Sequence, residues 1–291
     1  MNIGFLGFGE AASVFAADLQ RIGSPAERFA FDKYAGEKTK IAAQRTKTCL
    51  VSSLEELVSR CDIILSLVTG SAALAAAQEI AACIPENHLF IDCNSISPEM
   101  KYKISEAFVN EGKDMVDCAV MGSVPENGLK VSMLVAGKRA NLAEEKMKQM
   151  GFQISCISDR PGDAAAVKMV RSVFAKGLEA LFMEMLLAGK RYGVQDLVIS
   201  SVCSSIENKS LRDVMNTLVK SEVQHAKRKM REMQYVMQVL EDVNLPPIMS
   251  TATMNSYQWL LSLNAPQAAD FQKDTYLDIV DKINALIPRK V

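Results

Sequence analysis

The sequence IGFLGFGEAASVFAADL, residues 3–19, joins a short apolar run, a Gly-x-Gly turn and an amphipathic helical pattern. Gly7 can form the tight turn, Gly9 lets a pyrophosphate approach the backbone, and Ala12 takes the third position of a G-x-G-x-x-A pattern. A helix that begins after such a turn directs free N–H groups and a partial positive charge toward a phosphate. This strand–turn–helix unit predicts a dinucleotide-binding domain.

A carboxylate follows at the distance that such a domain requires. Asp32 ends the next apolar run, RFAFD (28–32), about twenty residues after the glycine turn. There it can accept hydrogen bonds from an adenosine ribose and would repel a 2′-phosphate, so NAD is slightly favoured over NADP. Lys33, Lys38 and Lys40 weaken this preference because they could neutralise a phosphate. The alternative is that the glycines form only a turn and that Asp32 only caps a loop.

Short apolar runs alternate with helical patterns through the first half of the sequence. Strands are predicted at residues 3–7, 28–32, 62–68, 88–92, 115–120, 130–137 and 152–157. Helices are predicted near residues 10–22, 36–45, 53–59, 71–83, 97–111 and 139–150. Such alternation indicates a mainly parallel sheet with helices on both faces. We therefore expect an α/β Rossmann-type doubly wound sheet over residues 1–160.

The pattern changes at Pro161-Gly162, which breaks the preceding structure, and Asp163 is a favourable helix N-cap. Residues 163–191 are continuously compatible with one long helix, and residues 195–286 contain no convincing strand. An all-α C-terminal domain is therefore predicted over residues 161–291. Because Ala, Leu, Phe and Met surround most of the long helix, several of its sides must be covered, and a homodimer built through this domain is expected.

Composition excludes several classes of function. The net charge of −1 argues against a general nucleic-acid or membrane surface. Seven scattered cysteines without a C-x-x-C pair are typical of free thiols in a reducing compartment. The chain has only two histidines, and none of its apolar runs reaches membrane-spanning length. We expect a cytoplasmic protein without a signal peptide, a metal site, a nucleic-acid partner or a membrane partner.

Further candidate residues follow two other predicted strands, at the edge where open α/β sheets bind ligands. Val68 and Thr69 end one of these strands, and Asn94 and Ser95 follow the other. Their alternative role is ordinary loop and cap chemistry. For Ser97 that alternative is preferred, and it is expected to cap the next helix.

Five segments, in order, resemble motifs of the β-hydroxyacid dehydrogenase superfamily, which includes 3-hydroxyisobutyrate dehydrogenase and 6-phosphogluconate dehydrogenase. They are the cofactor loop GFLGFGEAA, the strand end FIDCNSISPE, the substrate loop DCAVMGSV, the catalytic helix PGDAAAVKMVRS and the later helix KRKMREMQYVMQVLEDVNLPPIMSTA. The resemblance covers nearly the whole chain and is closest to a less-characterised branch. It implies a dehydrogenase or reductase that uses NAD(P)(H).

The same resemblance implies roles for individual residues. Lys168 would be the catalytic lysine, and Gly122 and Ser123 would help to hold a substrate carboxylate. Three positions depart from the usual family residues: Met121 for a serine, Ser172 for an asparagine, and Arg231-Glu232 for a lysine–aspartate pair. These departures leave an oxidoreductase in place but put the usual substrates in doubt.

Lys168 lies inside a run of Ala, Val and Met, where a lysine either extends to water or is held for chemistry. A lysine whose pKa is lowered by burial can exchange a proton with a substrate oxygen while a hydride moves to or from nicotinamide. Ser172 shares its helix face and could orient the same oxygen. Arg171, His225 or Arg231 could bind a carboxylate or phosphate. For His225 a solvated surface position is the open alternative.

The expected reaction is hydride transfer between NAD(P)(H) and a small β-hydroxy acid, or the matching semialdehyde or keto acid. The expected cofactor contacts are Gly7, Phe8, Gly9, Glu10, Ala11, Asp32, Lys33, Val68, Thr69 and Asn94. The expected substrate contacts are Ser95, Met121, Gly122, Ser123, Arg171, His225 and Arg231, with Lys168 and Ser172 as catalytic residues. Two alternatives remain: an imine reductase, which Lys168 argues against, and a non-catalytic dinucleotide-binding or sensing protein.

Overall fold

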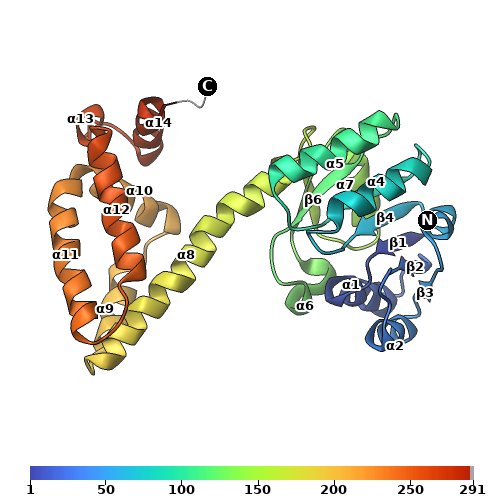
Figure 1. Ribbon diagram of the computed structural model, residues 1–291, viewed down its shortest axis with the longest axis horizontal. Helices are drawn as coiled ribbons and strands as arrows, with labels where there is room; N and C mark the ends of the chain where they lie inside the picture. Colours follow the sequence, from blue (N-terminus) through green and yellow to red (C-terminus); the bar gives the residue numbers. More distant parts are fainter. Residues whose placement is uncertain (289–291) are drawn as a thin grey trace. The chain divides into compact units, whose positions relative to one another are not determined.

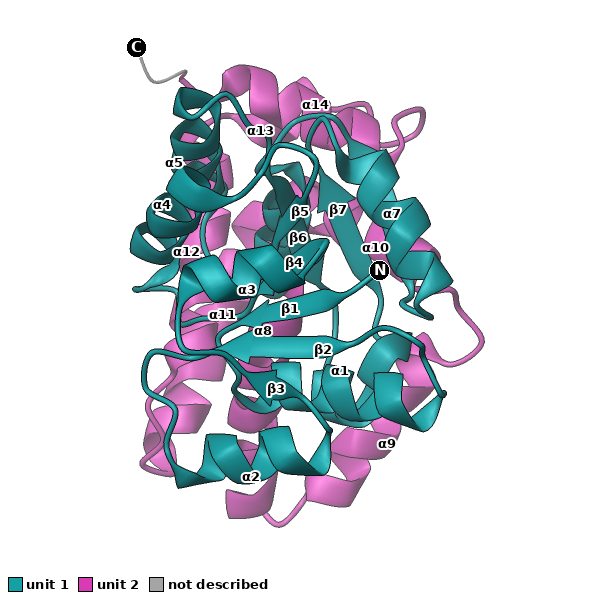
Figure 2. Cartoon of the chain, turned by 90° about the vertical axis from the view of Figure 1, so that its right-hand side faces the viewer, with its two compact units in different colours: residues 1–173 teal, residues 174–291 magenta. Residues whose placement is uncertain are grey.

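The computed structural model describes residues 1–288 (Figure 1). The chain divides into two compact units, which meet in sequence between Val173 and Phe174 (Figure 2). The first unit is a mostly parallel sheet flanked by helices, and the second consists of helices. The predicted fold class is therefore confirmed.

Unit 1 contains one eight-stranded sheet in the order β3-β2-β1-β4-β5-β6-β7-β8. Its strands are β1 (Ile3–Leu6), β2 (Arg28–Phe31), β3 (Cys49–Leu50), β4 (Ile63–Ser66), β5 (Leu89–Asp92), β6 (Val116–Val120), β7 (Met133–Ala136) and β8 (Ile154–Ser158). Neighbouring strands are parallel except for β6 and β7, which pair antiparallel. Because the strand order reverses between β1 and β4, a crevice for a ligand is expected beyond the carboxyl ends of these two strands.

The helices of unit 1 cover both faces of this sheet. They are α1 (Glu10–Arg21), α2 (Glu37–Arg45), α3 (Leu54–Arg60), α4 (Ala73–Cys83), α5 (Pro98–Asn110), α6 (Val124–Asn127), α7 (Ala140–Gln149) and the start of α8 (Asp163–Arg191), with a 3-10 turn at Gly128–Lys130. Successive strand residues face opposite sides. In β4, Ile63 and Leu65 join the core that includes α1 and α7, whereas Ile64 joins the core that includes α3, α4 and α5.

The predicted strands and helices of unit 1 are all present, with ends that differ by a few residues. Three short elements were not predicted: β3, α6 and the 3-10 turn at Gly128–Lys130. β3 has only two residues, which is too few to show an alternating pattern. β7 begins at Met133 rather than at residue 130, because Val131 still donates its N–H to the carbonyl of Gly128 in the preceding turn.

Helix α8 has the predicted bounds, but it belongs to both units. Ala164 and Ala165 are buried, and Ala164 packs against Ala119 and Ala136 of the sheet. The first turns of α8 are therefore part of unit 1, and the division falls within the helix rather than at the predicted position between residues 160 and 161. Small side chains at the start of α8 allow this close approach to the sheet.

Unit 2 contains the rest of α8 with α9 (Gln195–Ile206), α10 (Leu211–Gln224), α11 (Ala226–Asp242), α12 (Ile248–Ser262), α13 (Ala265–Ala268) and α14 (Tyr276–Leu286). Up to residue 288 it has no strand, as predicted. Its small core gathers Val223, Leu260, Ala265 and Ile279. Of the helices in the described part of the chain, none is both long and apolar enough to cross a membrane.

One carboxylate on α8 supports the start of another helix of unit 2. Glu184 accepts hydrogen bonds from the N–H groups of Met249 and Ser250, at 2.7 and 2.9 Å, and from the Ser250 hydroxyl at 2.7 Å. The first N–H groups of a helix lack partners within the helix, so an acceptor from elsewhere stabilises its start. Glu184 thus performs for α12 the function of an N-cap residue.

Candidate functional site

The glycine turn between β1 and α1 has the geometry that a pyrophosphate requires. Gly7 has a φ of +85°, and a Cβ there would lie 2.8 Å from the carbonyl oxygen of Leu67, so a side chain is excluded. Gly9 is the N-cap of α1, and a Cβ there would meet no atom within 4 Å. At this N-cap position, no side chain of residues 1–288 accepts a hydrogen bond from the first N–H groups of α1. The first N–H groups of a helix can bind a phosphate, and the space beside Gly9 leaves room for such a group at the start of α1.

Asp32 connects the end of β2 to this turn. Its Oδ2 accepts the N–H of Phe8 at 2.8 Å, and its Oδ1 accepts the N–H of Tyr34 at 2.9 Å. The Phe8 side chain is 1% exposed and packs edge-to-face on Phe5. Of the predicted cofactor residues, Phe8 thus offers neither its side chain nor its N–H group. Lys33 is exposed beside Asp32, as an ionic contact with a nucleotide would require.

The remaining predicted residues of unit 1 lie beyond the same edge of the sheet. Leu6 is in register with Ser66, Ser66 with Asp92, and Asp92 with Asp117. The segments that follow β1, β4 and β5 therefore begin side by side, and they carry the predicted residues Gly7, Gly9, Val68, Thr69, Asn94 and Ser95. Strand β6 continues three residues past Asp117, to Val120, before the loop with Met121, Gly122 and Ser123 begins.

Lys168 and Ser95, predicted separately, are in direct contact. The Lys168 ammonium donates a hydrogen bond to Ser95 Oγ at 2.6 Å, which links the second turn of α8 to the loop after β5. Lys168 is partly buried. The Ser172 hydroxyl donates to the carbonyl oxygen of Lys168 at 2.9 Å, so only its lone pairs remain for another group. Arg171 is exposed on the same helix.

Asn94, the residue before Ser95, is held by hydrogen bonds of its side chain. Its amide donates to Ser66 Oγ at 2.9 Å and also to the Asp92 carboxylate. Its Oδ1 atom is buried and has no hydrogen-bond partner among the residues described. Buried polar atoms are nearly always hydrogen-bonded, so Asn94 Oδ1 is an exception within the described part of the chain.

The loop after β6, predicted to bind the substrate, is held by packing and by its own backbone. Met121 is partly buried against the cluster of Ala119, Ala136 and Ala164. It therefore provides an apolar contact beneath the start of α8 rather than a polar group. Gly122 is exposed, and the carbonyl oxygen of Ser123 accepts hydrogen bonds from the Asn127 N–H and side-chain amide at 3.1 and 2.9 Å.

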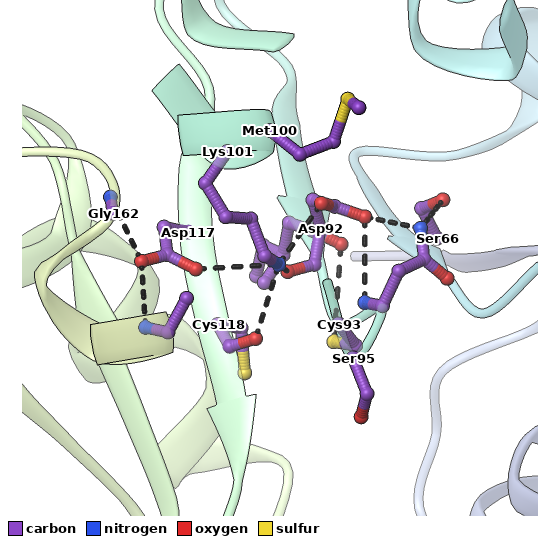
Figure 3. A network of polar contacts seen from close by, with 12 residues as sticks. Ser66, Asp92, Cys93, Ser95, Met100, Lys101, Asp117, Cys118 and Gly162 are labelled. Atoms are coloured by element: carbon purple, nitrogen blue, oxygen red, sulfur yellow. Dashed lines mark hydrogen bonds and ion pairs between the residues drawn. The ribbon is translucent and has the colours of Figure 1, made fainter. Parts of the chain in front are cut away.

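A buried ionic network lies beneath these residues (Figure 3). The ammonium of Lys101, on α5, is 2.9 Å from Asp92 Oδ2 and 3.2 Å from Asp117 Oδ1, and the side chains of all three are at most 1% exposed. It also donates to the backbone carbonyls of Asp92 and Cys118, at 2.5 and 3.3 Å. We call Lys101, Asp92 and Asp117 the buried triad.

The triad keeps Lys101 charged. Burial alone would lower the pKa of Lys101, but the Asp92 and Asp117 carboxylates outweigh it and raise that pKa above its usual value. Burial raises the pKa of Asp92, although the charge of Lys101 opposes this change. At neutral pH the ammonium is therefore the fixed charge around which the two carboxyl groups are arranged.

Asp117 also caps α8. Its Oδ2 accepts the N–H of Gly162 at 3.0 Å and that of Ala165 at 3.1 Å (Figure 3). Asp163, expected to be the N-cap, is instead the first helical residue and pairs with Arg160 at the surface, at 3.1 Å. The acceptor that starts α8 thus comes from strand β6.

The triad was not predicted from the sequence, although two signals of it were present. Lys101, Ile104 and Phe108 follow one another at intervals of three and four residues, so they lie on one face of α5. A lysine therefore occupies a helix face that is otherwise apolar. Asp92 and Asp117 each end or lie within an apolar run and are each followed by cysteine. A lysine in an apolar stripe and two carboxylates in neighbouring strands together predict an ion pair.

His225 and Arg231 belong to unit 2, where they line one basic cavity of about 420 Å³. Its other lining residues are Gln224, Lys227, Arg228, Glu232 and Tyr235. His225 is the residue just before α11, and Arg228 is paired with Glu232 on that helix. Arg231 is exposed. Two residues predicted to bind an anion thus share a cavity in which cations outnumber carboxylates.

Two segments of the chain match models of known protein families. Residues 2–158 match the model of the NAD binding domain of 6-phosphogluconate dehydrogenase, and residues 190–260 match a domain of unknown function. A 28.5 kDa protein of Methanothermus fervidus, described as uncharacterized, is 30% identical over 89% of this chain and 98% of its own length.

Two solved structures are also similar. One is a conserved protein described as structurally similar to 3-hydroxyacid dehydrogenases; it is 30% identical, with a TM-score of 0.62, and the match covers 92% of this chain and all of that one. The other is an imine reductase from Myxococcus stipitatus in complex with NADP+, with a TM-score of 0.75, 16% identity and a coverage of 97% and 100%. At that identity the second likeness concerns the fold alone.

Replacing Lys101 tests the triad. Lys101→Met leaves two carboxyl groups buried without their cation, so we expect the free energy of unfolding to fall by about 3–5 kcal/mol. Lys103→Met, on the exposed side of the same helix and paired with Glu99, is the control and should change little. Urea unfolding followed by circular dichroism measures both variants.

The pH dependence of the Lys101→Met variant is a second readout of the same prediction. Burial raises the pKa of Asp92, and the variant also lacks the charge that opposes this rise. The folded state then takes up a proton more readily than the unfolded state, so the stability lost at neutral pH is partly recovered near about pH 5. A deficit that does not shrink on acidification would contradict this account.

Proposed function

The chain belongs to the NAD(P)-binding dehydrogenase and reductase family represented by the NAD binding domain of 6-phosphogluconate dehydrogenase, and from that premise we propose that it transfers a hydride between NAD(P)(H) and a small β-hydroxy acid, or the matching semialdehyde or keto acid. The observation that carries the proposal is the hydrogen bond from Lys168 to Ser95, at the sheet edge where the family binds its ligands.

The cofactor contacts follow from the open start of α1 and the residues beside it. The N–H groups of Glu10 and Ala11 would bind the pyrophosphate, since Gly7 and Gly9 keep side chains out of its path. Asp32 retains lone pairs for the adenosine ribose beside Lys33. Further contacts would come from Val68, Thr69 and the unsatisfied oxygen of Asn94. When bound, the nicotinamide ring supplies or accepts the hydride.

Lys168 is proposed as the acid and base of the reaction. In oxidation its neutral amine takes the hydroxyl proton of the substrate, and in reduction its ammonium returns a proton to the carbonyl oxygen. The Ser95 hydroxyl already holds the Lys168 nitrogen and would orient the same substrate oxygen. Ser172 could only accept a further hydrogen bond, because its own proton is bound to the helix backbone.

The substrate carboxylate would be held by Gly122 and Ser123 of the loop after β6, with Met121 contributing apolar contact. Arg171, His225 and Arg231 are the proposed cations for a carboxylate or a phosphate, because an arginine fork binds either group through two hydrogen bonds. All seven cysteines are free thiols, which supports a cytoplasmic location.

An imine reductase is the second candidate, because the fold resembles such enzymes with a TM-score of 0.75. Lys168 favours the hydroxy-acid reaction, since a lysine acid and base suits proton exchange with a hydroxyl oxygen. Oxidation of NADH and NADPH, screened over semialdehydes, keto acids and cyclic imines, separates the two. If the protein binds the cofactor but turns over none of these compounds, a non-catalytic dinucleotide-binding protein is the remaining alternative.

A homodimer built through unit 2 is also proposed. An apolar cavity of about 670 Å³ opens among α8, α11 and α12. Its rim leaves Leu181, Tyr192, Val236 and Val239 between 41% and 46% exposed. Such a surface is typical of a protein interface, and a second copy of the chain is the proposed occupant.

Replacing Lys168 tests the chemistry. Lys168→Met keeps the length and apolar contacts of the side chain but removes the proton site, so kcat should fall about 10²–10⁴-fold. The dissociation constant for NADH should be retained, because Gly7, Gly9 and Asp32 are unchanged. Lys176→Met, further along the same helix and exposed, is the matched control. A Lys168→Met enzyme within about threefold of the wild-type kcat would return Lys168 to a purely structural role.

Nucleotide preference tests the role of Asp32. A 2′-phosphate would lie against this carboxylate, so fluorescence titration should give tighter binding of NADH than of NADPH. Asp32→Asn should weaken the discrimination by raising the affinity for NADPH. Tighter binding of NADPH by the wild-type protein would refute the preference and assign the dominant role to Lys33, Lys38 or Lys40.

The assembly is measured by sedimentation. The wild-type protein should sediment as a dimer at micromolar concentration, and Leu181→Glu should give monomers because it places a charge in the apolar cavity. Leu277→Glu on α14, at a position 56% exposed and outside this cavity, should leave the dimer intact. A wild-type protein that sediments as a monomer would refute the proposed homodimer.

A further inference from the structure

We propose that Asp117, held in place by Lys101, is the positioning residue that sets where Lys168 stands against Ser95. The inference rests on the proposed function, because it assigns to Asp117 a role in the use of Lys168. The Asp117 side chain is 0% exposed and faces no open space. It would act through the start of α8 alone.

The contact between Lys168 and Ser95 needs two separate segments to be fixed. Lys168 stands on α8, and Ser95 stands on the loop after β5, with 73 residues between them in sequence. A hydrogen bond of 2.6 Å tolerates little relative movement of its two ends. The residues that fix both segments therefore determine the geometry of the proposed site.

Asp117 fixes the segment that carries Lys168. Its carboxylate accepts the N–H groups of Gly162 and Ala165, at 3.0 and 3.1 Å. Lys168 follows Ala165 by three residues, which is only about 4.5 Å along a helix axis. The capped amide and the proposed catalytic lysine are thus less than one helical turn apart, so movement at the cap is transmitted directly to Lys168.

Asp92 and its neighbours fix the segment that carries Ser95. The Asp92 carboxylate accepts the side-chain amide of Asn94, and that amide also donates to Ser66 at 2.9 Å. Ser95 is the next residue along the chain. The Asp92 carbonyl oxygen accepts a hydrogen bond from Lys101 at 2.5 Å, so both its backbone and its side chain are tied to the same ammonium.

Lys101 joins the two segments, because its ammonium lies between the Asp92 and Asp117 carboxylates (Figure 3). The helix that carries it also touches the start of α8 directly. Gly162 has a φ of +98°, and a Cβ there would lie 3.1 Å from the carbonyl oxygen of Pro98, the first residue of α5. The ion pairs of Lys101 and the close approach of Gly162 to Pro98 therefore both fix the distance between the start of α8 and the loop after β5.

The charges of the network agree with a positioning role. Two carboxylates face one ammonium, and the partial positive charge of the α8 N-terminus lies on the other side of Asp117. Asp163, the acidic residue of α8's own first turn, interacts instead with Arg160 and with the side chain of Ser158 at the end of β8. The carboxylate that ties α8 to the site is therefore Asp117, and Asp163 offers a matched control.

The first experiment compares Asp117→Ala with Asp163→Ala. Asp117→Ala removes the acceptor of both N–H groups, and a displacement of about 1 Å at a reacting group can lower kcat roughly 10²-fold. The dissociation constant for NADH should stay within about twofold of wild type, because the residues around the glycine turn are unchanged. Asp163→Ala removes a carboxylate from the same helix terminus and should keep the wild-type kcat.

A labelling measurement reports on Lys168 without turnover. Acetic anhydride modifies lysine amines, and mass spectrometry gives the rate at Lys168 relative to the exposed Lys176 of the same helix. In the wild-type protein the bond to Ser95 should slow the reaction of Lys168. In Asp117→Ala that relative rate should rise, whereas in Asp163→Ala it should not. If the wild-type protein turns over no substrate, the proposed function fails, but the labelling still decides the positioning.

Two further variants separate positioning from general stability. Asp117→Asn keeps one oxygen that can accept the two N–H groups but turns an NH2 donor toward the Lys101 ammonium. It should therefore restore, in part, the kcat and the protection of Lys168 from labelling that Asp117→Ala loses. Gly162→Ala moves the start of α8 without altering any charge, and it should reproduce the losses even if Asp117→Ala does not fold.

Three outcomes would overturn the inference. The first is a folded Asp117→Ala protein with kcat and Lys168 labelling both within about twofold of wild type. The second is an equal loss in Asp163→Ala. The third is a loss of NADH binding in step with kcat and with the unfolding temperature, which would reveal a purely structural role for Asp117.

Discussion

The buried ammonium of Lys101 is the interaction on which the first unit depends. Removing an ion from water is costly, and the cost is offset only where geometry and additional hydrogen bonds are good. Here the ammonium lies 2.9 and 3.2 Å from two carboxylates and also donates to two backbone carbonyls. An ammonium has three N–H groups, so these four acceptors use all of its capacity.

The placement of this ion follows from the sheet. Asp92 and Asp117 are in register on the neighbouring parallel strands β5 and β6, and they point toward the same helix, α5. Two adjacent carboxylates would repel each other in a dry interior. The Lys101 ammonium between them and the N-terminus of α8 beyond Asp117 offset this repulsion. The same contacts attach α5 and the loop after β5 to the sheet, and they hold the start of α8 beside the start of α5.

Much of this fold could be predicted from local patterns. The glycine turn indicated β1 and α1, the alternation of apolar runs indicated the sheet, and the uninterrupted helix pattern gave α8 with its observed bounds. Ser97 caps α5 as expected, accepting the N–H of Met100 at 3.2 Å. The motif order also predicted the family, and residues 2–158 confirm it. Lys168 and Ser95 were each predicted as site residues, but their contact spans 73 residues and only the fold brings them together.

What could not be predicted depends on partners that are distant in sequence. Asp163 has every local feature of an N-cap, yet Asp117 accepts the first amides of α8 from 45 positions away. Phe8 lies in the glycine turn, yet its side chain belongs to the core. Local pattern shows which residues can form a cap or a turn, and long-range packing decides which of them do.

The division of α8 between the two units has a consequence for how such proteins can be recombined. A chimera joined in the loop before Pro161 would separate Asp117 from the two amides that satisfy it, and would leave a buried carboxylate to be matched by a foreign helix. A junction placed inside α8 after Val173 keeps every contact of the triad within one parent. If exchange of C-terminal helices has diversified this family, the crossover points that survive should fall within the helix and not in the linker that precedes it.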